Sequence, residues 1–224
     1  MRQKILRGKL DPSLGFVYAI WVVLLAEFIL ALTRFQLLAS FVAIGTFIIT
    51  LLPFALQKKF KLSIPNFFIA AIVFFIAASL FFGEESHFYY KFWWWDSMLH
   101  GFSAIGFGVL GFIIMVYLCQ SSKLKASPFL ISLFSFSFAL AIGALWEIFE
   151  YAMDQTFGTN MQKSGLPDTM KDLIVDSLGG MIASISGYLY LCYGKSSFFS
   201  SLIDPALKEN KHIFRHKLLK LEKQ

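Results

Sequence analysis

Charged residues are scarce in this chain. Asp, Glu, Lys and Arg make up 15% of its 224 residues, whereas 57% are hydrophobic and the mean hydropathy is +0.66. This apolar share is well above that of a typical soluble domain and indicates a membrane protein. The sequence also lacks a Gly-rich phosphate loop, a serine nucleophile motif, a Cys-x-x-Cys pair and a long-period repeat, so no motif-defined enzyme class applies.

Long apolar runs are abundant, and a transmembrane helix needs about 20 such residues. No run alternates polar and apolar residues at period two, which disfavours a transmembrane barrel. The fold class is therefore predicted as an all-α polytopic transmembrane bundle. A basic start before the first run also begins secretory signals, but the run is too long for a signal core and contains Glu27, so we expect a retained helix. The expected helices are 14–33, 36–56, 65–83, 96–119, 128–153 and 170–193.

The distribution of cations predicts the orientation. With six helices, 16 of the 20 Lys and Arg residues fall on the side that holds both termini, and the positive-inside rule assigns that side to the cytoplasm. Residues 1–194 are expected to form a single transmembrane domain, and 195–224 a basic amphipathic tail on the inner leaflet. The basic face matches an anionic bilayer surface, and nothing in its arrangement suggests nucleic acid.

Acidic residues concentrate at the other side. In this topology, the ionisable groups of four helices lie in one layer at or just below the outer interface, whereas the cytoplasmic halves of the last three helices carry no charge. Spacings of three or four residues place the acids of each helix on one stripe. The layer comprises Glu27; Asp96 and His100; Glu147, Glu150 and Asp154; and Asp168, Asp172 and Asp176.

Carboxylates on one stripe cannot face hydrocarbon without a cost of about 2.5–3.5 kcal/mol each, so they must turn toward the bundle interior, water or a cation. So many in one layer repel one another unless protons or a metal compensate them. The mixture of oxygens with one imidazole suits Mg²⁺, Mn²⁺, Fe²⁺ or Zn²⁺. The expected ligands are Asp96, His100, Glu147, Glu150, Asp154, Asp172 and Asp176, with Glu27, Asp168 and Thr169 as secondary candidates.

Several functions are compatible with this layer. A metal could activate water to cleave a phosphate ester of a lipid-linked substrate, with Glu147, Glu150 and Asp172 as catalytic residues. The same carboxylates could instead bind protons or cations in a transporter. A third interpretation is a non-catalytic membrane protein with a structural acidic layer. For Asp168 and Thr169 alone, helix capping is an alternative, because Thr169-x-x-Asp172 has the spacing of a capping box.

A longer pattern resembles a known family. It runs Trp95-Asp96-x-x-x-His100, Trp146-Glu147-x-x-Glu150-Tyr151, Gly158-Thr159, Gln162, Asp168-Thr169-x-x-Asp172 and Gly179-Gly180. Over roughly residues 93–187 it resembles the YjdF-like family of uncharacterised bacterial inner-membrane proteins and, more distantly, VanZ-like proteins. Ser97 stands where VanZ-like proteins would carry a basic residue after the aspartate. The resemblance implies a bacterial inner-membrane location and no particular activity.

Overall fold

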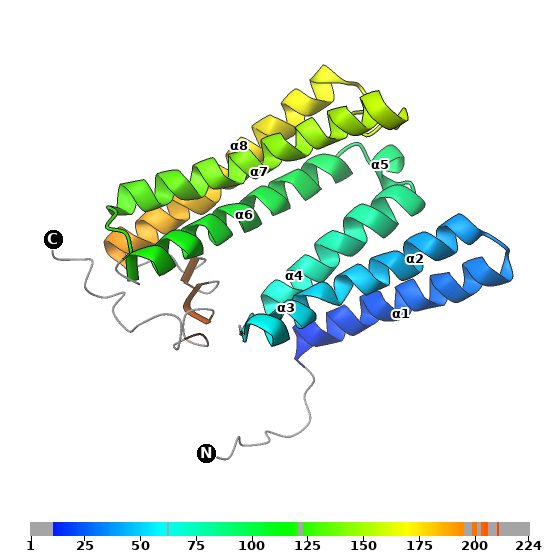
Figure 1. Cartoon of the computed structure of the whole chain (residues 1–224), viewed down its shortest axis with the longest axis horizontal. Coiled ribbons are helices and arrows are strands. Elements are labelled where there is room, and N and C mark those ends of the chain that lie inside the picture. Colours follow the sequence, from blue (N-terminus) through cyan, green and yellow to red (C-terminus); the bar gives the residue numbers. More distant parts are fainter. Residues whose placement is uncertain are drawn as a thin grey trace, which may run out of the picture. The chain divides into compact units, whose positions relative to one another are not determined.

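The computed structural model describes residues 11–61, 63–120, 123–194, 199–200, 203–205 and 210 (Figure 1). In this part of the chain all regular structure is helical, and six helices are long and apolar enough to cross a membrane. The expectation of an all-α transmembrane protein with six spans is confirmed. The chain divides into two compact units, residues 1–91 and 92–224. The single domain expected over 1–194 stays a prediction.

The first unit contains three of the six spans. Its core is a cluster of nine buried apolar side chains supplied by the first, second and third spans, with Val17, Val73 and Ala77 fully buried. The elements are α1 (Pro12–Thr33), α2 (Leu37–Thr50), α3 (Leu52–Phe60), α4 (Asn66–Ile76), the π-helix η1 (Ala77–Glu85) and α5 (Phe88–Lys91).

The second span differs from the single helix expected over 36–56, because it is divided at Leu51 into α2 and α3. Pro53 lies in the first turn of α3, where its missing N–H and its ring interrupt the preceding helix. The third span continues the α-helix expected over 65–83 as the π-helix η1, which ends at Glu85.

Polar contacts join the ends of the helices in this unit. Trp21 donates to the hydroxyl of Thr50 at 2.9 Å, which links α1 to the end of α2. Asp11 caps α1 through the N–H of Ser13 and also accepts from Asn66 at 2.8 Å. These bonds, that from Asn66 foremost, lower the pKa of Asp11 below its usual value, because they stabilise the carboxylate.

The second unit is a bundle of three long helices, each packed against the other two (Figure 1). Small residues permit their close approach. A Cβ at Gly108 would lie 2.6 Å from the side chain of Ala183, and a Cβ at Gly187 would overlap the ring of Phe112. Small residues of α6 and α8 thus let these two helices pack closely. The helices are α6 (Trp95–Gln120), α7 (Pro128–Phe157) and α8 (Leu166–Tyr193).

The connection between α7 and α8 is shorter than expected. Helix α7 continues four residues beyond 153 and stops at Gly158, whose φ of +65° ends the helix in the left-handed region. Helix α8 starts at Leu166 instead of 170, because Gly165 turns the chain and Pro167 favours the first helical turn. The capping-box interpretation is therefore wrong: Thr169 lies inside α8, and Gly165 occupies the N-cap position.

Part of the segment after α8 packs back on the bundle. Phe199 is fully buried, and the centroid of its ring lies 4.9 Å from the ring centroid of Phe112. The hydroxyl of Tyr190 donates a hydrogen bond to Asp204 at 2.6 Å. The apolar face expected in the tail, formed by Leu207, Phe214, Leu218 and Leu221, lies outside the described residues.

Candidate metal centre

Helix α6 brings two polar residues to one end of the three-helix bundle. Asp96 lies in its first turn, and His100 follows four residues later on the same face. The residues around them are apolar, so the helix directs this face to the bundle interior, where His100 is only 7% exposed. The imidazole is thereby held away from lipid and beside the acids of the two neighbouring helices.

Helix α7 supplies two glutamates from its last turns. Glu147 and Glu150 are buried, at 4% and 9% exposure, although the neighbouring Trp146 is half exposed. The indole N–H of Trp146 donates to Glu150 at 3.0 Å. One turn of α7 thus presents its carboxyl groups inward and its aromatic surface outward.

Helix α8 contributes the predicted stripe of three aspartates. Asp168, Asp172 and Asp176 follow one another at intervals of four residues, and all are at most 7% exposed. Burial of three acids in a row is costly unless each has a partner. The partners are His100 of α6, which contacts Asp176, and Lys171 of α8 itself, which contacts Asp168 and Asp172.

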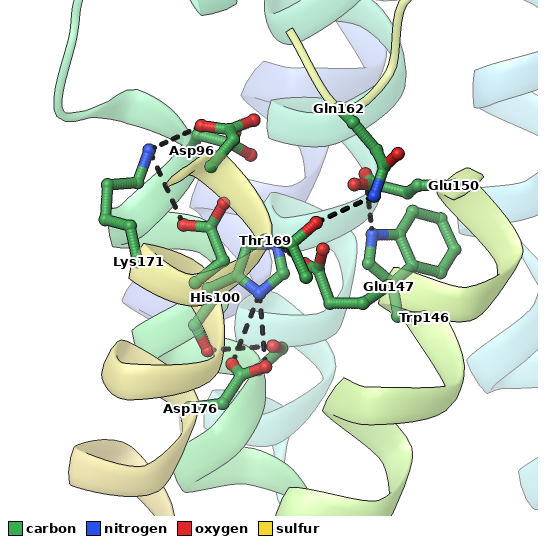
Figure 2. Close-up of polar contacts among 12 residues, drawn as sticks. Asp96, His100, Trp146, Glu147, Glu150, Gln162, Thr169, Lys171 and Asp176 are labelled. Carbon is green, nitrogen blue, oxygen red and sulfur yellow. Dashed lines mark hydrogen bonds and ion pairs between the residues drawn. The ribbon is translucent and has the colours of Figure 1, made fainter. Parts of the chain in front are cut away.

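Three of the side chains form a compact group. Ligand atoms of Asp96, His100 and Asp172 all lie within 4.8 Å of one another. Nδ1 of His100 lies 3.3 Å from both carboxylate oxygens of Asp176, and its Nε2 lies 3.7 Å from Oε1 of Glu147. Figure 2 shows His100, Glu147 and Asp176 directed toward one another from the three helices. Two aspartates and one histidine are residue types that bind divalent metals, although a complete ligand set has more than three members.

Two carboxylate oxygens of this cluster lack hydrogen bonds. Oε1 of Glu147 and Oδ1 of Asp172 are buried and have no hydrogen-bond partner among the described residues. Lys171 approaches the Asp172 oxygen to 3.7 Å, beyond hydrogen-bonding distance. Such orphaned acceptors are rare in folded proteins and point to a ligand or proton at the site.

Comparison with known families fits this architecture. Residues 14–192 match the family described as "Predicted membrane protein (DUF2238)". The chain belongs to this family. The match is consistent with the YjdF-like resemblance and extends it over the first three spans, which the resemblance did not cover. No curated protein and no solved structure matches the chain.

In this DUF2238 member the cluster also contains two lysines that sequence reasoning did not place there. Nζ of Lys163 lies 2.5 Å from Oδ2 of Asp96, and Nζ of Lys171 lies 2.9 Å from Oδ1 of Asp168. The Asp168–Lys171 spacing of i,i+3 could have revealed the second pair. Lys163 supplies to Asp96 a positive charge that Ser97 cannot provide. Six carboxyl groups thus face two ammonium groups.

The loop that carries Lys163 is organised by Asp154. Its carboxylate accepts hydrogen bonds from the hydroxyl of Thr159 at 2.6 Å and from the N–H groups of Met161 and Gln162 at 2.8 and 3.0 Å. The side-chain amide of Gln162 donates to Thr169 at 2.7 Å. Asp154 and Thr169 therefore anchor the α7–α8 loop, and their expected part in metal binding stays a prediction.

The remaining candidate, Glu27, lies in α1 of the first unit and is partly exposed. Its expected proximity to the acids of the second unit also stays a prediction.

Proposed function

We propose that Asp96, His100 and Asp172 bind a divalent metal ion, and that the protein uses it to hydrolyse a phosphate ester of a lipid-linked substrate. The observation that carries the proposal is the three-residue group, in which Oδ1 of Asp172, like Oε1 of the nearby Glu147, is buried and has no hydrogen-bond partner among the described residues. Oxygen ligands with one imidazole favour Mg²⁺, Mn²⁺, Fe²⁺ or Zn²⁺ over metals that need thiolates. A bound metal would lower the pKa of a water molecule and polarise a phosphoryl oxygen.

The glutamates of α7 have distinct parts in this proposal. Glu147 has a buried oxygen with no hydrogen-bond partner, next to the imidazole, which suits a general base that accepts a proton from water. Glu150 is held by Trp146 and acts with Glu147 to retain that proton within the buried cluster. Asp172 links metal binding to proton transfer, because it belongs to the three-residue group and also has a buried oxygen with no hydrogen-bond partner among the described residues.

The substrate class follows from the location of the cluster. Its residues lie at the ends of apolar helices, which suits a substrate with its polar group at the interface and its chain in lipid. The positive-inside rule assigns this end to the outer face of a bacterial inner membrane. Transport is less favoured, because α6 has no charged residue after His100, and none occurs in α7 before Glu147 or in α8 after Asp176.

The deciding experiment measures the metal content of purified protein and the effect of Mn²⁺ on its melting temperature. A ligand that binds only the folded state stabilises it by mass action, so the wild type should melt at a higher temperature with Mn²⁺. Asp96→Asn, His100→Ala and Asp172→Asn should lose the gain, whereas Asp11→Asn should retain it. A gain that persists in all three cluster variants would refute the metal site.

Activity requires a separate assay. With Mn²⁺ present, the protein should release inorganic phosphate from a lipid phosphomonoester in mixed micelles, and Glu147→Gln should lower the rate by about 100-fold or more while metal stays bound. Metal binding without phosphate release would favour the structural acidic layer. In that interpretation, the ion pairs of Lys163 and Lys171 already compensate part of the charge.

A further inference from the structure

We infer that Asp176 is a positioning residue for His100: seated against Gly143, it accepts a hydrogen bond from Nδ1 and directs Nε2 toward the metal. The inference rests on the proposed function and changes the expected role of Asp176 from metal ligand to partner of a ligand. It also gives a role to Gly143, which the sequence did not single out.

The first support is the contact itself. Asp176 is 1% exposed, and both of its oxygens lie 3.3 Å from Nδ1 of His100. It is absent from the compact group that His100 forms with Asp96 and Asp172. Asp176 thus contacts the imidazole without being a member of the compact group.

The second support is the space that holds the Asp176 carboxylate. A Cβ at Gly143 would overlap Oδ2 of Asp176 and would lie 2.8 Å from its Cγ. The carboxylate therefore rests against bare backbone of α7, and any larger residue at position 143 would displace it. The absence of a side chain at Gly143 is thus what lets α7 accommodate the carboxylate.

The third support is the close packing of α6 on α8 beside the same pair. A Cβ at Gly179 would lie 2.8 Å from that of Ala104 and 2.9 Å from the carbonyl oxygen of Gly101. Gly179 and Gly101 follow Asp176 and His100 by three residues and one residue. The packing of the two backbones thus sets the distance between carboxylate and imidazole.

The chemistry then assigns the two ring nitrogens. An ionised carboxylate only accepts hydrogen bonds, so the nitrogen that faces Asp176 must carry a proton. A histidine that ligates a metal through one nitrogen commonly donates the other N–H to a carboxylate, which fixes the ring and raises the basicity of the ligating atom. Nδ1 is therefore the donor, and Nε2, which is directed toward Glu147, is the metal-binding atom.

Two measurements on full-length protein in detergent test this role. In ¹⁵N-histidine-labelled protein, His100 should show an Nδ1–H proton at low field that exchanges slowly with water, with or without metal. His100→Gln identifies the signal. Asp176→Asn, which keeps the shape and removes the charge, should lose the low-field shift, and its Zn²⁺ affinity should fall roughly 10–100-fold.

Gly143→Ala provides an independent variant, because it changes neither His100 nor Asp176 chemically. It should lower Zn²⁺ affinity and alter the Nδ1–H signal as Asp176→Asn does. The matched control is Gly106→Ala, since a Cβ at that exposed glycine of α6 has no atom within 4 Å. Its affinity and its spectrum should equal those of the wild type.

The outcomes separate the inference from the proposed function. Unchanged Zn²⁺ affinity in Asp176→Asn and Gly143→Ala overturns the inference while leaving the metal site in place, as does an Nδ1–H signal that is absent or independent of Asp176. A wild type that binds no Zn²⁺ but has an Asp176-dependent Nδ1–H signal supports the orientation of His100 by Asp176 and removes the proposed metal chemistry.

Discussion

Replacement of Lys163 by glutamine is expected to change two properties in opposite directions. The ammonium group of Lys163 is 2.5 Å from Asp96, one of the three residues proposed to hold the metal. A metal that binds Asp96 must displace this ammonium group or share the carboxylate with it. The variant should therefore bind Mn²⁺ more tightly, although its metal-free form should be less stable because Asp96 loses its partner.

The size of both effects follows from the burial of the pair. The side chains of Lys163 and Asp96 are 24% and 13% exposed, between a surface ion pair and a fully buried one. Exposed pairs contribute about 0.2–1 kcal/mol, whereas breaking a buried pair costs about 3–5 kcal/mol. After allowance for solvent screening we expect roughly 1–2 kcal/mol, which corresponds to about tenfold in Mn²⁺ affinity.

The assay is a Mn²⁺ titration of melting temperature on wild type, Lys163→Gln and Lys91→Gln. Lys91 is the matched control, because its ammonium group donates to the carbonyl of Ser86 and forms no described pair with a carboxylate. Without metal, Lys163→Gln should melt roughly 2–8 °C below the wild type. If the variant binds Mn²⁺ with unchanged or weaker affinity, Lys163 does not compete with metal for Asp96 and the reasoning fails.

Three further outcomes are expected. Mn²⁺ should raise the melting temperature more at about pH 8 than at about pH 5, because carboxylate and imidazole ligands must lose protons to bind metal; equal gains would contradict this ligand set. Reporter fusions at Lys61, Ser122 and the C-terminus should report cytoplasm, with 84–95 and 154–169 outside, and a periplasmic signal at Ser122 would reverse the placement of the acidic cluster. Deletion of 205–224 should leave folding and membrane insertion intact, and loss of folded protein would show that the tail is part of the bundle.

The sequence predicted the elements of this fold better than their connections. Hydropathy and length identified six spans, because a helix in lipid must be long and apolar whatever it packs against. The split at Leu51 was missed, although Pro53 was a visible signal for it. The early start of α8 was missed because it depends on Gly165 at φ +69°, a conformation that a hydrophobicity pattern does not encode.

The same distinction holds at the candidate site. Spacing placed Asp172 and Asp176 on one stripe, because the periodicity of a helix is local. The partners of that stripe depend on tertiary structure: Lys163 reaches Asp96 from a loop in which its own φ is +41°. Nor did the sequence distinguish proposed metal ligands such as His100 from Asp176, which positions His100. The space for Asp176 is created by the absence of a side chain at Gly143.

The aromatic side chains beyond the cluster bear on ion permeation. Phe112, Tyr190 and Phe199 contact one another, and Phe112 and Phe199 are fully buried. Phe112 lies 16 residues along α6 from Asp96, a distance of about 24 Å at 1.5 Å per residue. An ion that left the carboxylates and travelled along the bundle would meet this aromatic plug after stretches of α6 and α8 that carry no charged side chain. Conduction through the three helices would thus require the plug to open, whereas a reaction at the cluster would not.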